Sequence, residues 1–191
     1  MPIDVLFIHS AGPQSGDQGS SLFVNHLRRS LGAGFNLISP QMPAPDAPSY
    51  ERWKQALQAL LPKDRAAPPI LIGHSLGGSV LLKYLSEERA GDGAAGLFVV
   101  ASPYWGSPNW KVDDFGLAEG FARHLPSALQ VHLYQSEDDE VVDIQHLSRY
   151  AKAIPTATVH KLDTGGHAFQ QGLPVLVADI EALAKSLPRG T

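Results

Sequence analysis

The sequence contains no cysteine, which excludes disulfide bonds, thiolate metal sites and a cysteine nucleophile. It also has no run near the roughly 20 apolar residues that a membrane-spanning helix needs. The opening residues Met1–Asp4 carry no positively charged side chain, and the apolar run Val5–Ile8 is too short for the core of a signal peptide. We therefore expect a cytoplasmic protein without a membrane partner.

Basic residues are few as well. The 15 Lys and Arg residues are outnumbered by 19 Asp and Glu residues, and the formal net charge is −4. No stretch concentrates positive charge, so we expect no nucleic-acid partner. A chain of 191 residues with 43% hydrophobic and 18% charged residues is typical of one globular domain, here residues 1–191.

Short runs rich in β-branched and aromatic residues alternate with longer segments of helical periodicity. Strands are predicted at Ile3–Ile8, Phe35–Ser39, Ile70–Gly73, Leu97–Ala101, Leu129–Tyr134 and Thr158–Leu162. Helices are predicted at Ser21–Leu31, Tyr50–Leu61, Leu76–Glu88, Leu117–His124, Ile144–Ala153 and Val175–Leu187. The first, third and fourth strand runs are almost continuously apolar, as in strands buried on both faces of a parallel sheet. The pattern predicts an α/β fold with about six parallel strands between two layers of helices.

A glycine-framed serine stands between a predicted buried strand and a predicted helix. Gly73-His74-Ser75-Leu76-Gly77 fits the pattern G-x-S-x-G, in which the serine occupies a strained turn with positive φ and exposes its hydroxyl. Positions 73 and 77 require a small residue because the strand and the helix nearly collide there, and glycine occupies both. The pattern predicts Ser75 as a nucleophile; the alternative is a glycine-rich turn with a bystander serine.

The candidate base is His167, which follows Gly165 and Gly166 on a loop directly after the last predicted strand. The two glycines predict an uncrowded backbone that lets the imidazole reach the serine. Most other histidines fall inside predicted strands or helices and are interpreted as surface or core residues, namely His26, His124, His132, His146 and His160. His74 is expected to pack or to hydrogen-bond locally.

The candidate acid lies in the acidic cluster Glu137–Glu140, which follows the fifth predicted strand. A carboxylate there can accept the second imidazole N–H and fix its tautomer. Asp139 is preferred because the apolar pair after it suits a turn into the next helix. Asp138 and Asp163 stay as alternatives. The order Ser, Asp, His along the chain is that of α/β-hydrolases.

An oxyanion formed during acyl transfer needs two N–H donors. The backbone amides of Leu76, beside the nucleophile, and Ala11, in the loop after the first strand, are the candidates. Tyr104, Trp105 and Trp110 follow the fourth strand and are candidate walls of a substrate pocket; the alternative is that they only pack their loop onto the body. The stretch from there to Leu117 is too short for a large lid.

The elbow Gly73–Gly77, the stretch Ser136–Asp139 and the pair Gly166-His167 together resemble the small, lidless serine hydrolases typified by retinoblastoma-binding protein 9 and its bacterial YdeN-like relatives. The likeness extends over nearly the whole chain. It implies the α/β-hydrolase fold in a minimal version, no cofactor, and hydrolysis of small esters or amides. It also implies that Ser75, Asp139 and His167 form the triad. The opening loop departs from the more glycine-rich version of that family, with Ser10 where glycine is usual.

The sequence thus predicts a serine hydrolase that cleaves small carboxylic esters through an acyl-enzyme. An amidase, peptidase or thioesterase with the same triad is one alternative, and a non-catalytic interaction protein on the same fold is another. Protein partners are not predicted. No metal is expected, because no group of His, Asp and Glu residues has convincing ligand spacing along the chain.

Overall fold

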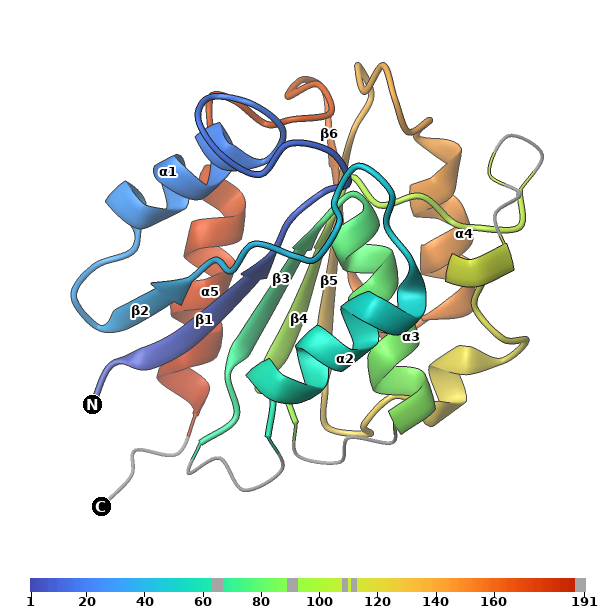
Figure 1. Cartoon of the computed structure of the whole chain (residues 1–191). Helices are drawn as coiled ribbons and strands as arrows, with labels where there is room; N and C mark the ends of the chain where they lie inside the picture. The colour runs from blue at the N-terminus through green and yellow to red at the C-terminus, as the bar shows by residue number, and fades with distance from the viewer. Residues whose placement is uncertain (63–66, 89–92, 108–109, 111–112, 188–191) are drawn as a thin grey trace.

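The computed structural model describes residues 1–62, 67–88, 93–107, 110 and 113–187 (Figure 1). Its six strands, all parallel, belong to one sheet with the order β2-β1-β3-β4-β5-β6. They are β1 (Ile3–Ile8), β2 (Phe35–Ile38), β3 (Ile70–His74), β4 (Gly96–Val100), β5 (Gln130–Ser136) and β6 (Thr158–Leu162). The α-helices are α1 (Ser21–Ser30), α2 (Tyr50–Leu60), α3 (Leu76–Glu88), α4 (Gln145–Ala153) and α5 (Pro174–Ser186). The predicted six-stranded parallel sheet is confirmed.

The direction in which the chain builds the sheet reverses at β1. The chain first goes from β1 outward to the edge strand β2, then returns across β1 to β3 and continues to β6. In open parallel sheets, the connections diverge at such a reversal and leave a crevice beyond the carboxyl ends of the strands. The loops after β1 and β3 border that crevice, so the topology alone brings the segment after Ile8 next to Ser75.

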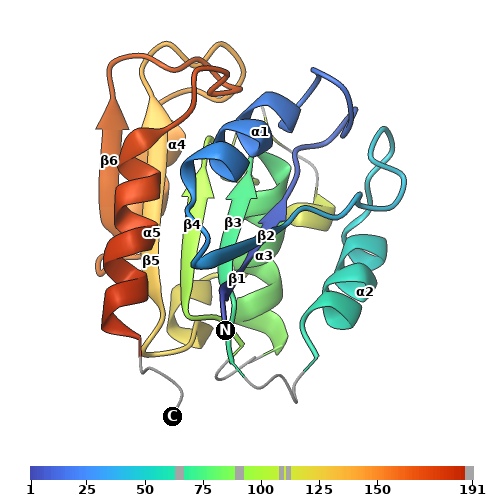
Figure 2. The same ribbon diagram turned by 90° about the vertical axis from the view of Figure 1, so that its left-hand side faces the viewer.

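Helices cover both faces of the sheet (Figures 1 and 2). Helices α1 and α5 pack on one face, and α2, α3 and α4 pack on the other. Strand β1 shows how period-two alternation divides the core, since Val5 and Phe7 point to the α1/α5 side while Leu6 and Ile8 point to the α2/α3 side. All four side chains are buried, as the continuous apolar run predicted.

The helix predicted at Leu117–His124 is wrong. Only a short 3₁₀ helix, η2 (Phe121–His124), forms there, after another, η1 (Asp113–Phe115). Gly120 has φ 70°, a left-handed conformation that a right-handed helix cannot continue through. The apolar spacing arises because Phe121 anchors the segment in the core, where it is 2% exposed.

The other predicted elements agree with the structure to within two residues at each end. No helix in the described ranges combines the length and the apolar character needed to cross a bilayer. Among the described residues, no insertion forms a large lid over the carboxyl ends of the strands.

Candidate active site

Ser75 stands at a tight junction between β3 and α3. Its φ is +52°, in the region that non-glycine residues rarely occupy, and α3 begins at the next residue. A Cβ on Gly73 would overlap the backbone of Gly78, and a Cβ on Gly77 would overlap the carbonyl group of Ile8 at the end of β1. Both glycines are therefore required by direct backbone contact, as the sequence predicted.

The Ser75 backbone continues the sheet even though its side chain leaves it. The Ser75 N–H donates a hydrogen bond of 2.8 Å to the carbonyl oxygen of Val100, the last residue of β4. This bond holds the turn in its strained conformation. The side chain lines a cavity and the residue is 9% exposed.

His167 and Asp139 meet beside this cavity. The Nδ1 atom of His167 is 2.9 Å from Oδ2 and 3.1 Å from Oδ1 of Asp139, whose side chain is fully buried. The backbone amides of Val141 and Val142 each donate a 2.8 Å hydrogen bond to Asp139 Oδ1. Burial alone would raise the pKa of Asp139, but the hydrogen bonds from His167 and these amides outweigh it and hold that pKa below its usual range.

The neighbouring acidic residues do a different job. Asp138 is exposed and accepts a 2.8 Å hydrogen bond from the backbone amide of Gly166. Glu140 accepts the backbone amide of His167 at 3.2 Å. Within the acidic cluster, Asp139 therefore contacts the imidazole, whereas Asp138 and Glu140 hold the backbone that carries the imidazole.

The glycine pair before His167 does not lie in an uncrowded loop, contrary to expectation. A Cβ on Gly165 would come within 2.5 Å of the ring of Phe169, which is 1% exposed. Gly166 has a left-handed φ of 58°. The pair is there because the loop folds tightly over a buried phenylalanine, so His167 is held in place by packing.

His74 joins three segments of the site. Its Nε2 atom is 2.8 Å from the carbonyl oxygen of His167, and its Nδ1 atom is 2.8 Å from Oγ of Ser20. Because a carbonyl oxygen only accepts, Nε2 carries the proton and Nδ1 accepts from the Ser20 hydroxyl. Ser20 Oγ also accepts the amide of Ser10, in the loop after β1, at 3.0 Å. His74 is buried and packs against Phe23, as expected, but its hydrogen bonds reach segments distant in sequence.

Burial is the main reason that the pKa of His74 is lowered to about 3, and the nearby His167 lowers it further. The ring is therefore neutral at physiological pH, in agreement with the hydrogen-bond directions. A neutral His74 adds no positive charge next to His167.

The backbone amides of Ala11 and Leu76 both belong to residues that line the cavity beside Ser75. The amides on either side of Ala11 are occupied, because Ser10 donates to Ser20 Oγ and Gly12 donates to the carbonyl of Pro45. Within the described part of the chain, neither Ala11 nor Leu76 donates its N–H to another protein group. Both N–H groups are thus free to bind a group that enters the cavity.

The cavity has a volume of about 720 Å³ and is bordered by Ser75 and His167. Trp105, Trp110 and Phe115 form an apolar wall, in which Trp105 packs against the other two with ring centroids 5.1 and 5.2 Å away. Trp105 and Trp110 were predicted pocket residues. Phe115 was not, because it lies beyond the aromatic loop and reaches the cavity only through η1.

Tyr104, the third predicted pocket residue, does not line the cavity. Its ring packs edge-on against Tyr150 of α4 at 4.9 Å, and its amide donates a 2.8 Å hydrogen bond to Nδ1 of His146. These contacts turn the side chain toward α4. Residues 108 and 109 of the same loop lie outside the described residues.

Comparison with known proteins identifies the family. Residues 5–129, more than half of the chain, match the model of the alpha/beta hydrolase family. The chain belongs to this family. No curated protein matches the sequence significantly.

Several solved structures share the fold of this chain. The ydeN gene product of B. subtilis is 21% identical, with a TM-score of 0.76 over 96% of this chain and 100% of that one. The meta-cleavage product hydrolase CumD of Pseudomonas fluorescens IP01 is 12% identical, with a TM-score of 0.75 over 96% and 90% of the two chains. The esterase RhEst1 of Rhodococcus sp. ECU1013 is 16% identical, with a TM-score of 0.72 over 98% and 92%.

The contact between Gly77 and the end of β1 predicts that Gly77→Ala destabilises the fold. Helix propensity alone would favour alanine by about 1 kcal/mol. The overlap with the Ile8 carbonyl should outweigh this and lower the free energy of unfolding by roughly 1–3 kcal/mol, measured by urea denaturation. Gly34→Ala is the control, because its Cβ would enter open space. Equal stabilities of the two variants would contradict this account of the elbow.

The lowered pKa of His74 predicts acid sensitivity. The unfolded chain binds a proton at the usual pKa of 6.5, whereas the folded protein does so only near pH 3, so stability is lost as the pH falls below 6.5. Between about pH 6 and pH 4.5, the free energy of unfolding should fall less steeply with decreasing pH in His74→Gln than in the wild type. The difference between the two slopes should be up to about 1.4 kcal/mol per pH unit. The exposed His124, replaced by Gln, is the control and should keep the wild-type slope. A wild-type slope in His74→Gln would refute a neutral, buried His74.

Proposed function

We propose that this protein is a serine hydrolase that cleaves small carboxylic esters through Ser75, His167 and Asp139. The observation that carries the proposal is the hydrogen bond between His167 and the buried carboxylate of Asp139, at the rim of the cavity that Ser75 lines. The family of the chain and the similar structures, which include an esterase and a meta-cleavage product hydrolase, support this reaction class.

The proposed reaction begins with proton transfer from Ser75 to His167. Because His167 donates its Nδ1–H to Asp139, its Nε2 is free to accept the proton of the serine hydroxyl. The serine oxygen adds to the ester carbonyl, and the amides of Leu76 and Ala11 stabilise the resulting oxyanion. His167 then returns the proton to the departing alcohol, which leaves an acyl-enzyme.

Hydrolysis of the acyl-enzyme repeats these steps with water. His167 takes a proton from the water, the hydroxide adds to the acyl carbon, and the proton returns to Ser75 as the carboxylic acid leaves. Asp139 keeps the imidazole in the required tautomer and stabilises the imidazolium. The lowered pKa of Asp139 supports this role, because the carboxyl group stays ionised at neutral pH.

Asp139 is proposed as the acid in preference to both alternatives. Asp138 is engaged with the Gly166 amide, and Asp163 is exposed. Only Asp139, among these three, contacts the His167 ring.

The substrate class follows from the lining of the cavity. The wall formed by Trp105, Trp110 and Phe115 favours an apolar acyl or alcohol group. Asp17 also lines the cavity, and its carboxylate disfavours an anionic substrate. A cavity of about 720 Å³ suits a small molecule. Small esters with apolar substituents are therefore the proposed substrates.

The first test is the hydrolysis of p-nitrophenyl esters of increasing acyl length. Ser75→Ala should lose roughly 10³-fold or more of the turnover while keeping its fold, since the replacement removes one oxygen atom. A fluorophosphonate should label the wild type and not the variant. Labelling without ester turnover would favour amides or thioesters as substrates. Folded protein that is neither labelled nor active would contradict a hydrolase and favour a binding role.

The second test separates the two neighbouring carboxylates. In Asp139→Asn, the amide oxygen would keep the hydrogen bonds from Val141 and Val142. The amide nitrogen would then replace Oδ2, which accepts from Gln135 Nε2 and His167 Nδ1, and would impose the wrong tautomer on His167. The kcat should fall by roughly 10³- to 10⁴-fold. Asp138→Asn keeps an acceptor for the Gly166 amide and should change kcat less than tenfold. The opposite ranking in steady-state kinetics would assign the role to Asp138.

A further inference from the structure

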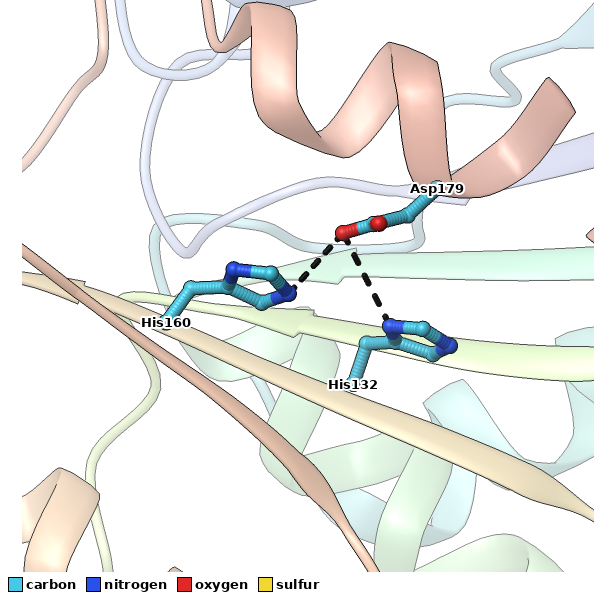
Figure 3. Close-up of side chains that lie close together, drawn as sticks. All are labelled: His132, His160 and Asp179. Carbon is cyan, nitrogen blue, oxygen red and sulfur yellow. Dashed lines mark ion pairs between the residues drawn. The ribbon is translucent and has the colours of Figure 1, made fainter. Parts of the chain in front are cut away.

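A second group of chemically versatile side chains lies between strands β5 and β6 and helix α5 (Figure 3). His132 comes from β5, His160 from β6 and Asp179 from α5. None of the three lines the cavity that contains Ser75. The group therefore needs an explanation separate from the proposed hydrolysis.

The three side chains point their ligand atoms at a common space. Oδ2 of Asp179 is 2.9 Å from Nε2 of His160 and 3.8 Å from Nδ1 of His132 (Figure 3). All three ligand atoms lie within 4.8 Å of one another. This is the only such group of three or more among the residues that the structure describes.

Two of these atoms have no hydrogen bond within the described part of the chain. Nδ1 of His132 and Nε2 of His160 are buried and make no hydrogen bond, although each would form an ion pair with the Asp179 carboxylate if its ring were protonated. His132 as a whole is 9% exposed. Buried ring nitrogens are normally satisfied, because an unpaired buried polar atom costs free energy. A cation between the three side chains would accept both lone pairs.

Neighbouring residues hold the ligands in position. The His132 ring stacks on Phe98 with centroids 4.7 Å apart, and the His160 ring stacks on Tyr134 at 4.5 Å with an interplanar angle of 2°. The Tyr134 hydroxyl donates a 2.6 Å hydrogen bond to Asp179 Oδ2. Such outer contacts are typical of metal sites, in which they fix the orientation of the ligands.

We propose that His132, His160 and Asp179 bind a divalent transition-metal ion, with Zn²⁺ as the best-fitting ion. Two imidazole nitrogens and one carboxylate oxygen are borderline ligands that suit Zn²⁺ and its neighbours and do not suit Mg²⁺ or Ca²⁺. Around a tetrahedral zinc ion, ligand atoms lie about 3.4 Å apart, so the 3.8 Å separation of His132 Nδ1 from Asp179 Oδ2 would shorten slightly and the 2.9 Å separation of His160 Nε2 from Asp179 Oδ2 would lengthen slightly.

The proposed ion would reach its site from solvent and fasten the sheet edge to α5. The side chains of His160 and Asp179 are 21% and 23% exposed, which leaves an approach and a fourth position for water. Strand β6 is an edge strand, paired only with β5. One ion would therefore join two adjacent strands and the helix that covers them.

The test measures zinc binding to chelator-treated protein by isothermal titration calorimetry, with Zn²⁺ alone as the ligand. We expect one ion per chain and an increase in the melting temperature, because an ion that binds only the folded state stabilises it. His160→Gln and Asp179→Asn should each weaken binding at least tenfold and lose the thermal shift. His124→Gln, which removes an exposed histidine elsewhere, should bind like the wild type.

Two results would overturn the proposal. One is the absence of saturable Zn²⁺ binding by wild-type protein. The other is wild-type binding in both His160→Gln and Asp179→Asn. If His167→Gln then loses binding, the ion lies at the candidate active site. Circular dichroism and melting without metal establish that the variants fold. Because the readout is binding, the outcome does not depend on esterase activity.

Discussion

The packing of β3 and α3 against the end of β1 is the constraint on which the rest of the site depends. Gly73 touches the backbone of Gly78, and Gly77 touches the carbonyl of Ile8. No side chain fits at either point, so the chain must reverse within one residue, and Ser75 takes that strained position with φ +52°. The same contact brings the loop after Ile8 next to the serine, so a single backbone approach sets the positions of the proposed nucleophile and of both amides proposed to receive the oxyanion.

This junction also controls the loop of the proposed base. His74 lies between Gly73 and Ser75, and it is 1% exposed. From there it holds the carbonyl of His167 with one nitrogen and Ser20 with the other. The buried His74 ring stays neutral, whereas Asp139, which contacts Nδ1 of His167, stays ionised. Asp139 is thus the carboxylate in contact with the His167 ring, and it would stabilise an imidazolium if His167 acts as the proposed base.

The sequence predicted well those features that local sterics or period-two alternation determine. The six strands, their parallel arrangement and the glycine-framed turn at Ser75 follow from patterns within a few residues. Features that depend on side-chain direction were less accessible. The turn of Tyr104 toward Tyr150 depends on α4, which lies far along the chain. The reach of Phe115 into the cavity depends on the short 3₁₀ helix η1, which apolar spacing did not reveal. The left-handed conformation of Gly120 prevents the helix predicted at Leu117–His124, and apolar spacing alone could not reveal this conformation.

The group His132, His160 and Asp179 was invisible to ligand spacing because its members come from three separate elements. Its position also bears on the proposed base. His167 lies in the loop that leaves β6 and enters α5, and Phe169 and Leu173 bury that loop on the α5 side of the sheet. The group joins the strand before this loop to the helix after it. An ion bound to His132, His160 and Asp179 would therefore hold β6 close to α5. It would also restrict the movement of the loop that carries His167.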